Sequence, residues 1–277
     1  MIYRRSILGF QLQSYRNLKR RLGFIDSIIE VNELAIRNLL KLKSQSEFTS
    51  YIKKLSDIHG IIVDFSKSYD VLSVKMAGSY IVKVYTEFEL FLYEFNNEFN
   101  EINKSAKWEY KNNCGSKLEQ SFKNVAQEFR YQDNLDFKIA EYYRYCRNMI
   151  VHTRDRNLEK KLRDEYNHLL SCKEEIIKSF NVKNAPKTIK ELSFEDFVLF
   201  TKVVKRIGKR LCKYSEPNQP ENIILSLDLR KFKKFINNEV RLKKCILGEL
   251  MTLYSYSQDE AVSLLNCVDI NEIICIL

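Results

Sequence analysis

The sequence predicts an all-α fold, because turn-forming residues are sparse and apolar residues recur at helical spacing. Only 7 Gly and 3 Pro occur among the 277 residues, whereas folds built of many short strands need frequent turns. The three prolines, Pro186, Pro217 and Pro220, all lie between helix-like stretches. From Phe24 onward, apolar residues recur at roughly the spacing of an amphipathic helix. We therefore expect a bundle of helices.

Three regions are expected along the chain. Residues 1–77 form an N-terminal helical region with a turn at Gly60. Residues 78–214 form a helical core that begins near Gly78 with the aromatic-rich helix SYIVKVYTEFELFLYEF. Residues 221–277 form a small C-terminal helical appendage. It follows the segment SEPNQPEN, which we expect to be a linker because it contains two prolines and no large apolar residue.

Within the core, turn residues separate the expected helices. Asn113 and Gly115 have the residue types of a turn, because both tolerate backbone conformations that other residues avoid. The helices of the core after this turn are expected over residues 134–152, 158–180 and 194–214.

Capping residues mark two further helix starts. Ser193 is expected to be the N-cap of the helix over 194–214, with the Asp196 carboxylate close to the N-terminus. In the appendage, a basic helix is expected over 229–244. Ser257 and Glu260 then have the spacing of a capping box, in which each side chain binds the other residue's backbone N–H.

The charge of the chain favours a polyanionic partner. There are 46 Lys and Arg against 36 Asp and Glu, a formal net charge of +10. Each Lys or Arg placed near a phosphate releases condensed counterions, so a basic protein has a general affinity for nucleic acid. We therefore expect a nucleic acid as the partner, although an acidic protein would satisfy the same charge.

Cysteine usage and hydropathy indicate a reduced, cytoplasmic protein. The seven cysteines are an odd number and form no CxxC pair, so neither a zinc framework nor a redox motif is expected. Nowhere do about 18 uncharged apolar residues follow one another, as a membrane-spanning helix requires. The N-terminal apolar run is also interrupted too soon for a signal peptide. We expect no metal, no cofactor and no membrane partner.

The residues that indicate chemistry lie late in the helix over 134–152, where Arg147, Asn148 and His152 form an RNxxxH pattern. A histidine can remove or deliver a proton near neutral pH. A guanidinium binds phosphate oxygens in a fork and stabilises the negative charge that builds on them. An amide such as that of Asn148 can orient the imidazole or the phosphate. Together these groups suit cleavage of RNA by its own 2′-hydroxyl.

This pattern resembles the motif of the HEPN superfamily, whose ribonuclease members carry RNxxxH late in one helix of a helical bundle. The resemblance covers roughly residues 78–214. It implies a HEPN-like bundle with N- and C-terminal helical extensions, and a metal-independent endoribonuclease with Arg147, Asn148 and His152 as catalytic residues. It also implies a homodimer, a role in phage defence or toxin-type RNA restriction, and a regulatory or inhibitor protein as a further partner. Some toxin-type members have a Tyr two residues after the His, where this chain has Arg154, so regulation through that tyrosine is not expected.

Helix geometry limits how the motif can assemble. At about 100° per residue, Asn148 and His152 lie on one helix face, whereas Arg147 lies about 140° from His152. Arg147 and His152 therefore cannot converge along an ideal helix. Either the helix ends before His152, or the motif of a second chain completes the site.

Three neighbouring residues are candidate RNA contacts: Arg144, Tyr145 and Arg154. Arg144 can bind phosphate, but an ion pair with Glu141 is an equally good use of it. Tyr145, like the adjacent Tyr142 and Tyr143, can stack on a base or pack in a core.

Two other functions remain open at this point. A non-catalytic HEPN-like module could bind RNA or a nucleotide, and a helical interaction protein could bind an acidic partner through its basic face. The presence of both Arg147 and His152 favours the nuclease, because a protein that only binds has no need of an imidazole.

Overall fold

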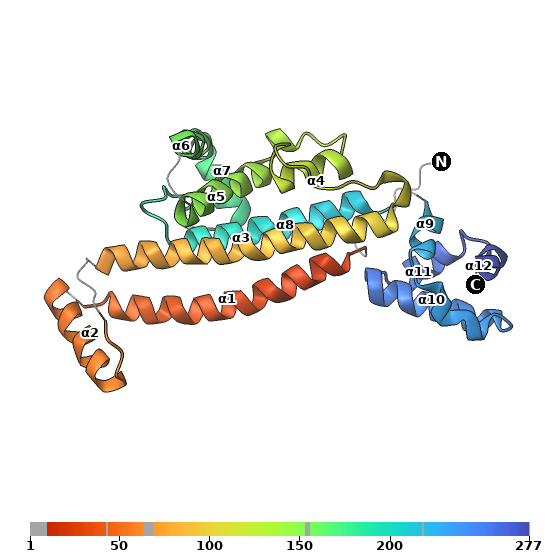
Figure 1. The fold of residues 1–277 in the computed structure, drawn as a ribbon, viewed down its shortest axis with the longest axis horizontal. Helices are drawn as coiled ribbons and strands as arrows, with labels where there is room; N and C mark the ends of the chain where they lie inside the picture. Colours follow the sequence, from red (N-terminus) through yellow and green to blue (C-terminus); the bar gives the residue numbers. More distant parts are fainter. Residues whose placement is uncertain (1–9, 43, 64–68, 153–155, 218, 277) are drawn as a thin grey trace. The chain divides into compact units, whose positions relative to one another are not determined.

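All regular secondary structure is helical in the part of the protein that the computed structural model describes, residues 10–42, 44–63, 69–152, 156–217 and 219–276. No strand occurs among these residues, which confirms the all-α prediction (Figure 1). The α-helices are α1 (Gln13–Leu39), α2 (Gln45–His59), α3 (Tyr69–Ile102), α4 (Lys117–Val125), α5 (Leu135–Val151), α6 (Arg156–Ser171), α7 (Lys173–Phe180), α8 (Phe194–Ser215), α9 (Pro220–Leu225), α10 (Glu239–Tyr254), α11 (Gln258–Leu265) and α12 (Ile270–Ile276). Three short 3₁₀ helices are η1 (Lys104–Ala106), η2 (Tyr131–Asp133) and η3 (Leu229–Phe235).

The chain divides into two compact units, each assembled from separate stretches of sequence. Unit 1 comprises Met1–Lys19, Phe88–Tyr131 and Lys205–Leu277, and unit 2 comprises Arg20–Glu87 and Gln132–Val204. The predicted boundary at residue 78 does not coincide with a boundary of either unit. The helix α3 continues through Gly78 without a break. The predicted appendage, residues 221–277, belongs to unit 1.

The core of unit 2 surrounds the motif helix α5. Ile81 and Val84 of α3 are fully buried. So are Tyr142 and Tyr143 of α5, and the Tyr143 ring packs on Phe200 of α8 with centroids 4.9 Å apart. These aromatic rings therefore contribute to the internal packing of the unit, because large rings bury the most apolar area.

A buried carboxylate joins α8 to α5 in the same unit. Asp196 accepts hydrogen bonds from the Tyr143 hydroxyl (2.9 Å) and the Lys187 backbone N–H (2.9 Å). It also accepts from the backbone N–H and the hydroxyl of Ser193, at 2.9 and 3.0 Å. Burial raises the pKa of Asp196, and these four donors oppose the rise. The expectation that α8 starts after Ser193 is confirmed.

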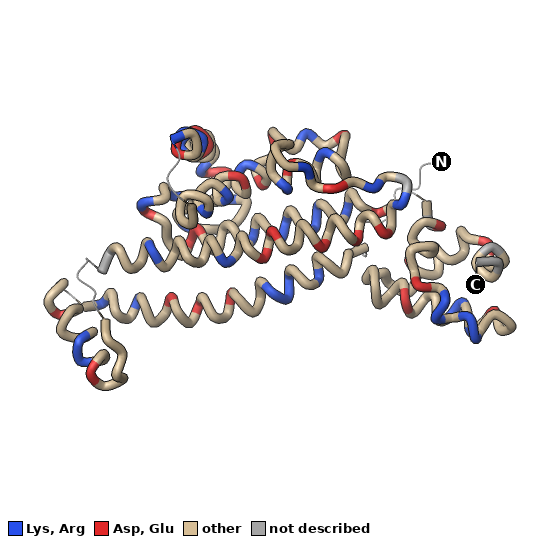
Figure 2. Tube along the Cα trace, in the orientation of Figure 1, with Lys and Arg blue, Asp and Glu red and all other residues tan. Residues whose placement is uncertain are grey.

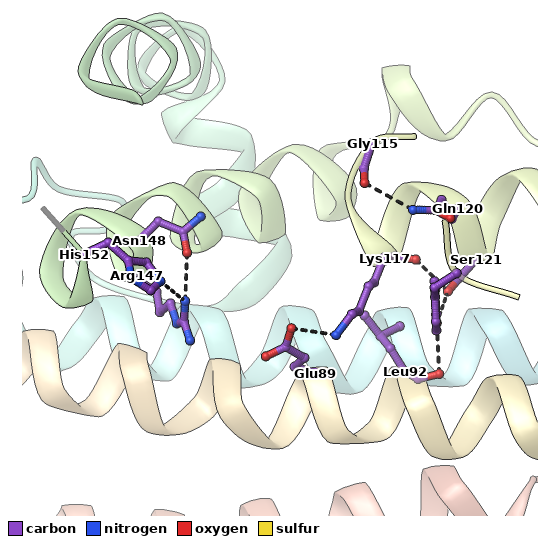
Figure 3. Close-up of polar contacts among 10 residues, drawn as sticks. Glu89, Leu92, Gly115, Lys117, Gln120, Ser121, Arg147, Asn148 and His152 are labelled. Atoms are coloured by element: carbon purple, nitrogen blue, oxygen red, sulfur yellow. Dashed lines mark hydrogen bonds and ion pairs between the residues drawn. The ribbon is translucent and has the colours of Figure 1, made fainter. Parts of the chain in front are cut away.

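In unit 1, polar contacts hold α4 against α3. The Tyr110 hydroxyl donates to the Leu92 carbonyl at 2.9 Å and lies 2.9 Å from the Ser121 hydroxyl. Lys117 pairs with Glu89 at 2.9 Å (Figure 3). The same stretch of α3 has a run of buried phenylalanines whose rings pack on one another: Phe88, Phe91, Phe95 and Phe99.

The C-terminal helices of unit 1 carry the densest basic stretch. Lys and Arg gather along η3 and the start of α10 (Figure 2). The expected single helix over 229–244 is instead η3 followed by α10, because Asn238 caps α10 by accepting a hydrogen bond from the Arg241 N–H at 3.0 Å. The capping box of Ser257 and Glu260 is confirmed.

Other local predictions have mixed outcomes. Asn113 and Gly115 both adopt positive φ, at 63° and 92°, which confirms the turn. The helix expected over 158–180 is two helices, α6 and α7, with Cys172 between them. The linker expected over 215–222 is shorter, because α8 extends to Ser215 and α9 starts at Pro220.

The apolar surface of α3 is largely covered by the chain itself. Of the residues that make this helix apolar on several faces, Tyr80, Ile81, Val84, Phe88 and Phe91 are buried, whereas Leu90 is 44% exposed and Tyr93 is 49% exposed. Most of the apolar surface of this helix therefore needs no second chain to cover it. The dimer itself stays a prediction. Among the described helices, none is both long and apolar enough to traverse a bilayer.

Candidate active site

The motif lies at the C-terminal end of α5, and the helix stops one residue before the histidine. Asn134 caps the N-terminus by accepting from the Phe137 N–H at 3.3 Å. At the other end, His152 has an extended backbone (φ −107°, ψ 164°), while its N–H still donates to the Asn148 carbonyl at 2.9 Å. Of the two arrangements that helix geometry allowed, the structure therefore has the first, in which the helix ends before His152.

This helix end brings the three motif side chains together within one chain. The Nη1 of Arg147 lies 2.9 Å from Nε2 of His152 and donates to the Asn148 side-chain oxygen at 3.0 Å (Figure 3). The extended backbone of His152 swings its ring back towards Arg147, which overcomes the ~140° separation of an ideal helix. A second chain is not needed for the Arg147–His152 pair.

The contact with Arg147 defines the protonation state of His152 in this arrangement. A guanidinium carries donors only, so the Nε2 of His152 must be the acceptor. The ring is then neutral, with its proton on Nδ1, an assignment that follows from the hydrogen-bond pattern. Arg147 thus faces a basic nitrogen rather than an acid, and His152 is exposed to solvent.

Arg147 is held by an aromatic ring and an amide rather than by a carboxylate. Its guanidinium lies over the Tyr85 ring of α3, 5.3 Å from the centroid, and the side chain is half-buried. No carboxylate of the described residues forms an ion pair with it. Aromatic faces attract guanidinium groups without neutralising them. The positive charge beside His152 is therefore available to an incoming anion.

Arg144, one turn earlier on the same helix, has the opposite environment. Its guanidinium forms two hydrogen bonds with the Glu141 carboxylate, at 2.7 and 3.0 Å. It also lies over the half-buried Tyr145 ring, 4.4 Å from the centroid. The ion-pair alternative for Arg144 is thus the one observed, and RNA binding by Arg144 and Tyr145 stays a prediction.

The remaining candidates lie elsewhere. Tyr142 and Tyr143 are fully buried, so they pack in the core rather than stack on bases. Arg154 lies outside the described residues. The two other histidines, His59 at the end of α2 and His168 in α6, are exposed and take no part in the motif. Within the described part of the chain, no three His, Cys, Asp or Glu side chains are grouped as a metal site.

A cavity of about 1120 Å³ opens beside the motif, and His152 forms part of its wall. Met149 and Ile150 of α5 line it, together with Gly78 of α3. A Cβ built on Gly78 would lie 3.3 Å from Cδ1 of Ile150, so the glycine allows α3 and α5 to approach closely here. Sequence reasoning treated Gly78 as the start of a helix and missed this role, which depends on a residue 72 positions away in the chain.

Tyr85 was also missed as part of the site. It was visible only as one aromatic residue in an aromatic-rich helix, and nothing in its local sequence connects it with Arg147.

Comparisons with protein-family models, with characterised proteins and with solved structures found no match for this chain.

Proposed function

We propose that the protein is a metal-independent endoribonuclease of the HEPN type, with Arg147 and His152 as its catalytic residues and Asn148 as a positioning residue. The observation that carries the proposal is the 2.9 Å contact between Arg147 Nη1 and a basic His152 Nε2 on an exposed helix end. A proton acceptor and a phosphate-binding cation are the two groups that cleavage by a 2′-hydroxyl requires.

In the proposed reaction, a phosphodiester takes the place of His152 as the partner of Arg147. The guanidinium binds the non-bridging phosphate oxygens, and the Nε2 lone pair of His152 becomes free. His152 then removes the proton of the neighbouring 2′-hydroxyl, and the 2′-oxygen attacks phosphorus. The bond from phosphorus to the 5′-oxygen breaks, and that oxygen takes a proton from water. The products are a 2′,3′-cyclic phosphate and a 5′-hydroxyl.

Asn148 has a positioning role in this scheme. Its side-chain oxygen accepts from the same Arg147 nitrogen that contacts His152, so it fixes the guanidinium at the helix end. Stabilisation by prearranged donors is strongest when the donors need not reorganise during the reaction. The biological setting we propose is RNA restriction of the phage-defence or toxin type, as the resemblance of the motif implies.

The test is cleavage of total cellular RNA by the purified protein in EDTA. We expect wild-type protein to cut, and His152→Ala to be slower by a factor of about 10²–10⁴, the usual contribution of a general acid–base group. His168→Ala is the matched control, because His168 is an exposed helical histidine outside the motif. Cutting at the wild-type rate by a folded His152→Ala protein would rule out the proposed role of His152.

A further inference from the structure

The cavity beside the motif has mostly apolar walls and a fixed aromatic ring. Val74 and Gly78 of α3 and Met149 and Ile150 of α5 line one part of it, and Tyr166 of α6 another. The Tyr166 ring packs against the buried Tyr142 ring with centroids 5.9 Å apart. At about 1120 Å³, the cavity has room for a nucleoside, since pockets of about 300–1,000 Å³ hold ligands of drug size.

The charged residues of the same cavity are predominantly basic. Lys75, Arg163 and Lys190 line it and are exposed, against a single acidic residue, Glu159. An apolar interior with exposed cations at its border matches a nucleotide of an RNA strand. The uncharged aromatic base suits the apolar interior, and the charged phosphates on both sides of the ribose suit the cations. Stacking on aromatic side chains with phosphate contacts around them is how proteins bind unpaired bases.

His152 connects this cavity with the catalytic pair. Its Nε2 contacts Arg147, and His152 is also one of the residues that line the cavity. In the proposed reaction, His152 takes the proton from the 2′-hydroxyl of one ribose. The base attached to that ribose is the group best placed to enter the adjoining cavity.

We propose that this cavity holds the base of the nucleotide that supplies the attacking 2′-hydroxyl, which makes RNA unpaired at that nucleotide the substrate. The inference rests on the proposed function for the identity of the nucleotide. A base that is paired and stacked in an RNA duplex cannot enter the cavity without leaving the duplex, so the nucleotide must be unpaired.

The first test is binding of full-length protein to 2′-fluoro RNA, which lacks the attacking hydroxyl. We expect a single strand to bind at least about tenfold more tightly than the same strand in a duplex or a base-free ribose-phosphate strand of equal length, because stacking of one base on an aromatic side chain typically tightens binding by about tenfold or more. Fluorescence anisotropy in EDTA measures the three affinities. Equal affinity for the three would overturn the proposal.

Matched variants locate the binding site. Ile189→Trp places a large side chain in the cavity, and Leu170→Trp makes the same kind of change at an exposed position of α6 outside it. We expect the first variant to lose about tenfold in single-strand affinity and the second to bind normally. Lys190→Gln is a second variant at an exposed cavity residue, with Lys183→Gln, exposed and outside the cavity, as its control. We expect weaker binding only in Lys190→Gln.

The outcomes separate this inference from the proposed function. If no RNA is cut but the single strand binds selectively and Ile189→Trp abolishes that selectivity, the nuclease proposal fails and the base site remains. If wild-type protein cuts RNA and a folded Ile189→Trp protein cuts at the same rate and the same nucleotides, the base site fails and the nuclease remains. Lys190→Gln binding indistinguishable from Lys183→Gln would also count against the site.

Discussion

The hydrogen bonds of Asp196 predict that replacing this residue with asparagine destabilises the protein, although the two side chains have nearly the same shape. Each carboxylate oxygen accepts a backbone N–H, one from Lys187 and one from Ser193. An asparagine side chain has only one oxygen, so its NH₂ group must face one of these two donors. At least one of these part-buried N–H groups then loses its acceptor, whichever way the amide is turned.

The size of this effect follows from the same contacts. Asp196 is fully buried, and its oxygens also accept from the hydroxyls of Tyr143 and Ser193. An unsatisfied buried donor costs about 1–3 kcal/mol, and hydrogen bonds to a charged acceptor are stronger than neutral ones. We therefore expect Asp196→Asn to lower the free energy of unfolding by about 2–4 kcal/mol.

Glu195→Gln is the matched control for Asp196→Asn. Glu195 is half-buried and accepts one described hydrogen bond, from the Lys183 backbone N–H at 3.0 Å. A glutamine keeps an oxygen for that bond, so the expected change is within about 0.5 kcal/mol. Urea unfolding followed by circular dichroism measures both variants, as the shift in midpoint multiplied by the slope of the transition. If Asp196→Asn unfolds within 0.5 kcal/mol of wild type, the reasoning about its donors is wrong; this bound is about the scatter of neutral substitutions.

Four further results are expected. Gly208→Ala should destabilise the protein, because the new Cβ would lie 2.7 Å from Cδ2 of the buried Tyr15 and overpacking of about 1–3 kcal/mol exceeds the helix gain of about 1 kcal/mol. Gly248→Ala, with nothing within 4 Å of its Cβ, should stabilise it by up to about 1 kcal/mol, and the opposite order in thermal unfolding would contradict the packing argument. Iodoacetamide should label the exposed Cys114 and Cys267 but leave the buried Cys146 and Cys212 unlabelled in the native protein. The reason is that burial raises the pKa of the Cys146 and Cys212 thiols, that of Cys212 to about 12. Labelling of the buried pair, detected by mass spectrometry, would refute this. Arg147→Lys should impair RNA cleavage far more than Arg144→Lys, since lysine lacks the planar fork and Arg144 already pairs with Glu141, and equal activity of the two variants would show that Arg147 supplies only charge. Mixing Arg147→Ala with His152→Ala should recover no activity, because the two side chains meet within one chain, whereas recovery would indicate a site shared between chains.

Local signals were sufficient to predict the motif helix and the start of α8. The helix expected over 134–152 agrees with α5 to within one residue at each end, and Ser193 predicted the start of α8. Caps and turns depend on side chains within a few residues of one another, so the sequence contains what is needed to predict them. The end of α5 before His152 was one of two arrangements left open by helix geometry, and only the structure decided between them.

The remaining parts of the site depend on contacts between distant residues. The Tyr85 ring beneath Arg147, the close approach at Gly78 and the cavity wall at Tyr166 all come from elements far apart in the chain. Hydrophobic periodicity predicts that a helix buries a face but not which helix it packs against. The break at Cys172 was also missed, because apolar residues continue at helical spacing on both sides of it.

The nature of the 3′ ends left by the purified protein tests the central claim most directly. Wild-type protein is incubated in EDTA with a synthetic single-stranded RNA, and the products are analysed by mass spectrometry beside those of His152→Ala. We expect fragments ending in a 2′,3′-cyclic phosphate, paired with fragments that begin with a 5′-hydroxyl, and we expect both to be lost in the variant. Fragments ending in a 3′-hydroxyl, or cleavage only after magnesium is added, would contradict it.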